Sequence, residues 1–346
     1  MSLKVKIDLP MAEVARVFNS YKEAYGTQPA PVSVLTFSAD LNDLKLDDII
    51  REIELPPYDS QAFNNAFIEM LSKGLSYNAS FLYDMLIYQR YGRPLGNYWK
   101  GMPEVTLQVG PGGSLGCEVL LCMAGTKKAY TLDRFPLLRF NLDSFIQVID
   151  KFSEVIRLTR QINGIGTFSY KPDYETINER LYRIGNSHIE HVYPRSFEES
   201  GLDSGIIDFL FSHATFEHVR APLKCIKEIR RLLKPGGLTA HCIDLRDHRN
   251  FDHPLRFLRE SDESWEKIMK EYCKYDGSGY MNRWRASDFR KAFELEGFEI
   301  LECNAEMEAT AQVIEAEMPL LDKKYRTFSR EDLAVTTLFV VARKNK

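Results

Sequence analysis

The 346-residue sequence has no apolar run close to the roughly 20 residues that a membrane-spanning helix requires, and its first residues lack the apolar core of a secretory signal. Its six cysteines form no Cys-x-x-Cys pair, which argues against a structural zinc site, and we expect reduced thiols in a cytoplasmic protein. There is no basic excess either, because 45 Lys and Arg face 49 Asp and Glu. The net charge of −4 argues against a general nucleic-acid-binding protein.

What the sequence does have is the composition of a globular protein with a core, 44% hydrophobic and 27% charged, and no internal repeat. Proline dipeptides at Arg93-Pro94 and Met102-Pro103 mark a boundary. We therefore expect a mainly helical N-terminal extension over residues 1–100 and a main domain over 101–346, with insertions at about 140–186 and 249–285. The extension is expected either to close the active site of its own chain or to serve as a homodimer contact.

Beyond residue 104, short apolar segments alternate with helical patterns. This alternation predicts an α/β fold with a doubly wound, mostly parallel sheet, on which ligands bind at the carboxyl ends of the strands. The predicted strands are Val105–Val109, Ala129–Leu132, His188–Tyr193, Ile206–Phe211, Leu238–Leu245, Phe298–Cys303 and Ala334–Ala342. The predicted helices are Ala62–Leu75, Ser80–Tyr91, Cys117–Ala124, Tyr174–Ile184, Ala221–Leu233 and Ser287–Leu295.

The main motif is a glycine turn, Gly110-Pro111-Gly112-Gly113, between the first strand of this domain and a helix. Glycine permits positive φ and close approach of a ligand, and the helix N-terminus favours an anionic group. A dinucleotide fingerprint is incomplete because its third glycine is replaced by Leu115, and a P-loop is absent. Asp133 ends the next strand, where its carboxylate could accept both hydroxyls of a ribose. A tight turn with a surface aspartate is the alternative interpretation.

Two further segments follow in order, Ser212-His-Ala-Thr-Phe-Glu217-His218-Val and Leu233-Lys-Pro-Gly-Gly237. With the glycine turn and Asp133, they resemble class I S-adenosylmethionine (SAM)-dependent methyltransferases, in particular the broad group with an "EHV…LKPGG" signature. The resemblance covers about residues 104 to 343. It implies a Rossmann-like, seven-stranded sheet whose last strand is antiparallel.

The resemblance also implies roles for residues. The glycines would line the methionine part of SAM, Asp133 would hold the ribose, and the segment from Tyr193 would border the adenine. The residues expected to bind the cofactor are Gln108, Gly110, Pro111, Gly112, Gly113, Asp133, Arg134, Tyr193, Ser212 and His213. Gln108 departs from the pattern, because the family usually has Asp or Glu there, and an amide brings no charge to the SAM ammonium.

A polar cluster, Asp244-Leu-Arg246-Asp247-His248, follows the fifth strand of the domain. We predict His248 as a base for an acceptor hydroxyl, oriented by Asp244 or Asp247, and Arg246 as a partner for an anionic group. His213 is the second candidate base. A polar loop with local ion pairs is an equal alternative.

This cluster and the segment Asn282-Arg283-Trp284-Arg285 resemble "DLRDH" and "NRxR" segments of methyltransferases of unassigned substrate, some of them from glycan-assembly gene clusters. The resemblance implies a substrate site at Asp244, Arg246, Asn282 and Arg283.

The sequence thus predicts SAM-dependent methyl transfer to a hydroxyl of a small-molecule or glycan acceptor, which releases S-adenosylhomocysteine. The alternative is an inactive SAM-fold scaffold or binding module, favoured by Gln108 and the N-terminal extension. An NAD-dependent oxidoreductase is disfavoured by the missing glycine. No metal is expected, because the pairs His188/His191 and His213/His218 lack an acidic companion at metal-ligand spacing.

Overall fold

The computed structural model describes residues 76–147, 149, 173–273, 279–307 and 309–345. The helix predicted over Ala62–Leu75 and most of the 1–100 extension lie outside these residues. Among the helices that are described, none combines the length and the apolar character needed to cross a bilayer.

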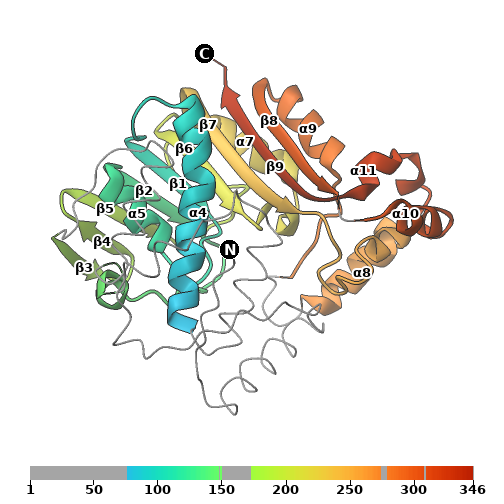
Figure 1. Cartoon of the computed structure of the whole chain (residues 1–346), viewed down its shortest axis with the longest axis horizontal. Helices are drawn as coiled ribbons and strands as arrows, with labels where there is room; N and C mark the ends of the chain where they lie inside the picture. Colours follow the sequence, from blue (N-terminus) through green and yellow to red (C-terminus); the bar gives the residue numbers. More distant parts are fainter. Residues whose placement is uncertain (1–75, 148, 150–172, 274–278, 308, 346) are drawn as a thin grey trace, which may run out of the picture.

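Nine strands of the described chain form a single mixed sheet, in the order β3-β4-β5-β2-β1-β6-β7-β9-β8 (Figure 1). The strands are β1 (Val105–Val109), β2 (Lys128–Leu132), β3 (Tyr174–Asn178), β4 (Leu181–Ile184), β5 (Ser187–Val192), β6 (Ile207–His213), β7 (Leu233–Asp244), β8 (Phe298–Met307) and β9 (Val335–Lys344). The centre is parallel, with β5, β2, β1, β6 and β7 running in one direction. The seven predicted strands are confirmed, as is the antiparallel last strand, β9.

The prediction of a seven-stranded, mostly parallel sheet is wrong, because the segment predicted as the helix Tyr174–Ile184 forms β3 and β4 instead. The two strands pair with each other and add antiparallel to β5. In β4, buried Tyr182 and Ile184 flank exposed Arg183, which is the two-residue period of a strand. Gly185 has a φ of 57° and lets the chain reverse tightly into β5.

The helices flank this sheet on both faces. They are α4 (Ser76–Tyr98), α5 (Gly116–Ala124), α7 (Pro222–Leu232), α8 (Asp262–Tyr272), α9 (Ala286–Leu295), α10 (Ala311–Glu317) and α11 (Arg330–Ala334), and the 3-10 turns are η1 (Phe216–His218), η2 (Arg256–Arg259), η3 (Met318–Leu320) and η4 (Tyr325–Thr327). Five of the predicted helices fall on described residues; four are confirmed, within α4, α5, α7 and α9. Helix α4 continues through Pro94, so Arg93-Pro94 does not end it.

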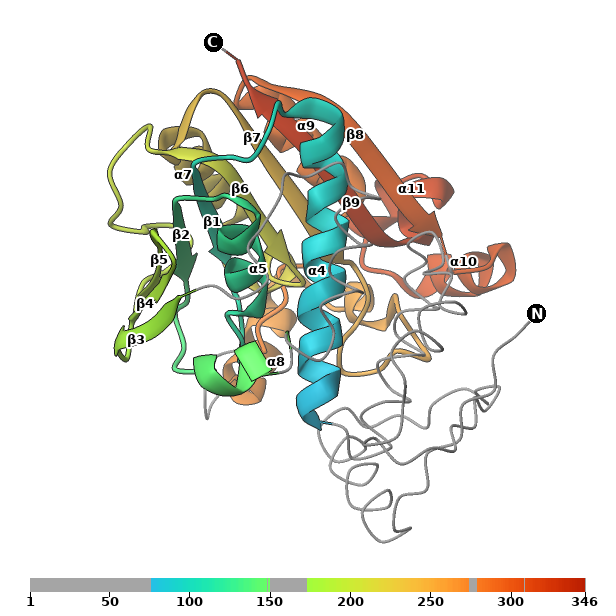
Figure 2. The same cartoon turned by 60° about the vertical axis from the view of Figure 1, so that its left-hand side comes forward.

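Each face of the sheet has its own core. Helices α4 and α5 cover one face and α7 and α9 the other (Figures 1 and 2). Strand β6 is buried on both sides and sends Phe209 and Phe211 to the first core and Leu210 to the second. A central parallel strand covered on both faces is uniformly apolar for this reason.

A third cluster packs α8 against α10 and α11, near the end of β7 and the start of β9 (Figure 1). Buried Arg285 ties it to the sheet by donating to the carbonyl oxygens of Leu245 at 2.7 Å and Val335 at 2.5 Å, and to two further carbonyls of α11. The inserted segment that precedes α9 is therefore anchored to the main domain.

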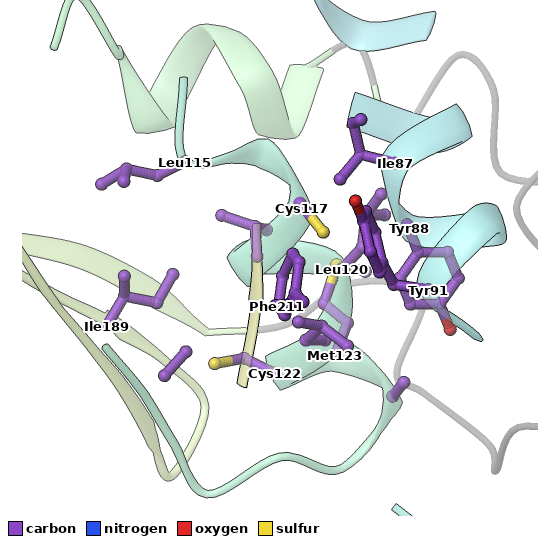
Figure 3. Packing of buried hydrophobic residues seen from close by; sticks show 14 of the residues in the cluster. Ile87, Tyr88, Tyr91, Leu115, Cys117, Leu120, Cys122, Met123, Ile189 and Phe211 are labelled. Atoms are coloured by element: carbon purple, nitrogen blue, oxygen red, sulfur yellow. The ribbon is translucent and has the colours of Figure 1, made fainter. Parts of the chain in front are cut away.

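Helix α4 packs directly on α5. Ile87, Tyr88 and Tyr91 of α4 face Cys117 and the other apolar side chains of α5 (Figure 3). A hydrogen-bond chain joins the helices at the glycine turn: Gly116 N donates to Ser114 Oγ at 3.1 Å, and Ser114 Oγ donates to Asp84 Oδ2 at 2.6 Å.

We predict that Gly116→Ala destabilises the protein by about 1–3 kcal/mol, the usual cost of overpacking a core. A Cβ at this position would lie 2.2 Å from Asp84 Oδ2 and 2.4 Å from Phe145, so both buried side chains would have to shift. Urea unfolding measures the change. Gly113→Ala is the matched control, because its Cβ would meet only Leu137 O at 3.7 Å, and it should stay within about 1 kcal/mol of wild type. Equal stability of both variants would contradict the close contact.

Candidate active site

The glycine turn leaves β1 at the carboxyl edge of the sheet. Gly110 and Gly112 have φ values of 70° and 67°, in the left-handed region that favours glycine. A Cβ on Gly110 would lie 2.4 Å from Thr215 Oγ1, so the close approach of the loop after β6 also requires glycine there. A Cβ on Gly112 would meet no protein atom within 4 Å, because this residue faces open space.

Asp133 follows β2 at the same edge and is buried. Its Oδ1 accepts a hydrogen bond from Phe135 N at 2.9 Å. Burial raises the pKa of the Asp133 carboxyl, and the backbone amides of Phe135, Arg134 and Gly112 oppose this shift. No Lys or Arg side chain of the described chain forms an ion pair with Asp133, so its acceptor capacity is available to a ligand.

A cavity of about 230 Å³ brings the turn and Asp133 together. Its polar wall comes from the turn, Asp133 and the loop after β6, and apolar side chains form much of the rest. The lining residues are Val109, Gly110, Gly112, Leu132, Asp133, Arg134, Phe135, Leu137, Arg195, Phe197, Glu198, Ala214, Thr215, His218, Val219, Arg220 and Tyr280.

The other residues expected at the cofactor are more scattered. Arg134 lines the cavity, whereas Tyr193 lines a separate groove with Arg180 and His191. Ser212 points its hydroxyl away from the cavity, to His241 Nδ1 at 2.7 Å in the core under α7 and α9. Gln108 is buried, and its Oε1 has no hydrogen-bond partner among the described residues. Neither Pro111 nor Gly113 lines the cavity.

A second group of polar side chains lies beside the cavity. Glu217, His218 and His248 each place a potential ligand atom within 4.8 Å of the other two. Burial raises the pKa of Glu217 to about 8 and lowers that of His218 to about 4. His218 Nδ1 lies 2.7 Å from Tyr280 O, which fixes the N–H at Nδ1 and leaves the lone pair at Nε2.

Of the two acids predicted to orient His248, it is Asp244 that lies beside its ring, 3.4 Å from Nε2. Burial opposes ionisation of Asp244, but His248 and Arg246 outweigh it and hold the pKa of this carboxyl below its usual range. Asp247 instead binds Arg249, with Oδ1 and Oδ2 accepting from its guanidinium at 3.0 and 2.9 Å. Arg246 is paired in the same way with Asp244.

His213 ends β6 under α4. Its Nδ1 lies 3.3 Å from the hydroxyl of Tyr91, and its ring contacts Tyr83 edge to face. Burial, assisted by the charge of Arg90, lowers the pKa of His213 well below its usual value, so the imidazole is neutral. Tyr91 also donates to Ser212 O at 2.6 Å, which ties α4 to the end of β6.

Asn282 and Arg283 of the NRxR segment were expected to bind a substrate, but in this structure their side chains hold loops. Asn282 donates to the carbonyls of Phe216 and Val219 at 2.6 and 3.1 Å. Arg283 is buried and donates to Glu260 O and to Asp262. Asn282 thus holds the segment that carries Glu217 and His218, whereas Arg283 holds the segment between η2 and α8.

Sequence reasoning missed several residues of this site. Thr215 lies two residues beyond the end of β6 and Phe135 three beyond the end of β2, so the positions shortly after the strands were the signal for them. Asp84, Tyr83 and Tyr91 come from α4, far away in the sequence, and no local pattern places them here.

These features define the class of fold: an α/β, Rossmann-like sheet with a ligand cavity at the carboxyl ends of its central parallel strands. Residues 175–240 match a family model described as a methyltransferase domain. The matched segment runs from β3 into β7 and includes Glu217 and His218. No curated protein shows a significant match to the chain.

Solved structures similar to the chain include methyltransferases. A candidate methyltransferase of Bacillus halodurans is 17% identical, with 76% of this chain and 99% of that chain covered and a TM-score of 0.38. Phosphoethanolamine N-methyltransferase 2 of Haemonchus contortus, solved with SAM, is 14% identical over 76% of this chain and 52% of that chain, with a TM-score of 0.37. A geranyl diphosphate methyltransferase, also solved with SAM, is 11% identical over 83% and 92%, with a TM-score of 0.40.

We predict a pH-dependent effect of Asp84→Asn. Burial raises the pKa of Asp84 to about 7, against a hydrogen bond from Ser114 that lowers it. Since the folded pKa lies above the unfolded value, the contribution of this carboxyl to stability is fully present below about pH 4 and is lost as the pH rises through about 7. The stability of the variant relative to wild type should therefore increase from pH 4 to 8, by on the order of a few kcal/mol. Thermal unfolding at several pH values measures it, with the exposed Asp252→Asn as control. A difference between Asp84→Asn and wild type that stays constant with pH would contradict the prediction.

Proposed function

We propose that this protein is a SAM-dependent methyltransferase that binds its cofactor in the cavity at the ends of β1 and β2. The observation that supports it best is the convergence of Gly110, Gly112 and the buried carboxylate of Asp133 on one cavity. The match of residues 175–240 to a methyltransferase-domain model supports the same class of activity.

The residues present fit such a cofactor. Gly112 faces open space where a side chain would obstruct a ligand, and the turn leads to the N-terminus of α5. Asp133 has an acceptor oxygen for the ribose hydroxyls. Phe135, Leu137 and Phe197 give the cavity an apolar wall suited to an adenine ring.

The bound cofactor would supply an electrophilic methyl group: the acceptor atom bonds to the methyl carbon while the sulfur leaves with the electron pair of the broken C–S bond, giving S-adenosylhomocysteine. The protein's part is to align acceptor and methyl and to exclude water. The rings of Tyr83, Tyr91 and His213 between α4 and β6 would provide an apolar wall on the side of α4.

We place the activation of the acceptor beside the cavity, at the cluster of Glu217, His218 and His248, with Asp244 next to His248. A hydroxyl of a small molecule or glycan is the proposed acceptor, since a hydroxyl needs a base and His218, whose Nε2 carries a lone pair, lines the cavity. Arg246 would act through Asp244, because the two side chains are paired.

The first test is thermal unfolding with and without SAM or S-adenosylhomocysteine. A ligand at 100 times its Kd should stabilise the wild type by about 2.7 kcal/mol. Asp133→Ala should weaken binding by about 10–100-fold, the cost of hydrogen bonds to a charged group. The exposed Asp252→Ala should bind as wild type does. Titration calorimetry gives the same Kd values independently.

The absence of stabilisation by either ligand would contradict the proposal, and stabilisation by NADH instead would indicate an oxidoreductase. Binding of SAM without turnover on a broad set of hydroxyl acceptors would favour the scaffold alternative.

A further inference from the structure

The cluster beside the cavity contains a buried carboxyl group whose oxygens have no hydrogen-bond partner among the described residues. Glu217 is 4% exposed, and neither of its carboxylate oxygens has a hydrogen-bond partner within the described residues. A buried polar group without a partner is costly, so native proteins rarely keep one without a ligand, water or ion. Two imidazoles, those of His218 and His248, complete the cluster.

One of these imidazoles, that of His218, is held as metal-binding histidines are held. A ligating histidine usually gives its second ring nitrogen to a carbonyl or a carboxylate, which fixes its tautomer and orientation. His218 gives Nδ1 to the carbonyl of Tyr280 at 2.7 Å. His248 Nε2 lies 3.4 Å from Asp244 Oδ2 and is buried without a hydrogen-bond partner among the described residues, so this nitrogen is available to an ion.

The dimensions also fit a cation. With metal–nitrogen and metal–oxygen bonds of about 2.1 Å, two ligands of one ion lie at most about 4.2 Å apart. The potential ligand atoms of Glu217, His218 and His248 lie within 4.8 Å of one another. Side-chain movements of less than about 1 Å would therefore bring all three onto one ion.

We propose that Glu217, His218 and His248 bind a divalent first-row transition-metal cation. Two imidazoles and one carboxylate are ligands typical of Zn²⁺, Mn²⁺, Fe²⁺ or Co²⁺, whereas Mg²⁺ and Ca²⁺ favour sites made of oxygen ligands alone. Three protein ligands leave coordination positions open, which is characteristic of a catalytic rather than a structural site.

The site has a role that rests on the proposed methyl transfer. His218 belongs both to this cluster and to the lining of the cavity, so an open coordination position would be next to the ligand. An acceptor hydroxyl that binds such a cation loses its proton at a lower pH than in water, which makes its oxygen a nucleophile. His248 is then a metal ligand rather than the base predicted from the sequence: the cation lowers the pKa of the bound hydroxyl, and the released proton passes to water.

The experiment is a titration of chelator-treated, SAM-free protein with Co²⁺, followed by visible absorption. Wild type should develop ligand-field bands that saturate at about one Co²⁺ per chain, and Zn²⁺ should displace the ion. Glu217→Gln, which keeps the shape of the side chain, should weaken Co²⁺ binding by more than the roughly 10–100-fold cost of losing an outer partner. His248→Asn should do the same. His253→Ala removes an exposed histidine of the same insertion and should bind as wild type does.

Thermal unfolding of the metal-free variants shows that they are folded, and Zn²⁺ should raise the midpoint of wild type but not of Glu217→Gln. Absence of the Co²⁺ bands in wild type, or equal Co²⁺ affinity in Glu217→Gln and wild type, would overturn the metal site. Because no SAM is present, this result is independent of the cofactor test. SAM binding without Co²⁺ binding would overturn only the metal site. Co²⁺ binding without SAM binding would overturn only the proposed methyl transfer.

Discussion

The parallel pairing of β2, β1, β6 and β7 is the constraint on which the rest of the structure depends. Val109, the last residue of β1, pairs with Leu132 of β2 and with Ser212 of β6, and His213 pairs with Cys242 of β7. These strands therefore end at one edge. The residues that follow them (Gly110, Asp133, Ala214 and Leu245) leave the sheet side by side, although the first and the last are 135 positions apart in the sequence. A one-residue change of register would turn the inward side chains of a strand to the opposite face and separate the turn from Asp133.

Helix α4 is tied to this edge of the sheet by packing and by hydrogen bonds. Its apolar side packs on α5, Tyr91 binds the carbonyl of Ser212, and Asp84 binds Ser114 of the glycine turn. After the inserted helix α8, the side chain of Asn282 donates hydrogen bonds to the carbonyl oxygens of Phe216 and Val219. The short segment with Glu217 and His218 is thus fixed from two sides, which gives the buried carboxylate and imidazoles defined positions despite their lying outside regular strands.

Local patterns predicted the elements of the sheet but not its edge or the contacts between distant segments. The Val105–Val109 strand and the glycine turn were evident because apolar residues run directly into glycines. The helix predicted over Tyr174–Ile184 is instead the β3–β4 hairpin. Gly185-Asn186, which follows this segment, is a turn signal that favours antiparallel strands. The alternation of the apolar residues Tyr182 and Ile184 with Arg183 is a second signal that favours a strand.

In the candidate site, too, the residues next to predicted strands could be predicted from the sequence, but the contacts between distant loops could not. Gly110, Gly112 and Asp133 follow predicted strands, so the sequence could place them at one edge. The meeting of His248 with Glu217 and His218 depends on how the loop after β7 folds back over η1, and spacing alone had given these histidines no acidic companion. The polarity of Asn282 and Arg283 indicated a substrate site, yet in the structure backbone carbonyls and Asp262 take up their hydrogen bonds. A polar side chain is equally suited to binding a substrate and to holding a loop, and only the fold shows which of the two roles it has.

The most direct test of the account is a crystal structure of the protein with S-adenosylhomocysteine. The account predicts that the ligand lies in the cavity between the glycine turn and Phe197, with its homocysteine part at Gly110 and Gly112 and its ribose hydroxyls on Asp133. A ligand bound instead in the separate groove lined by Arg180, His191 and Tyr193 would contradict it.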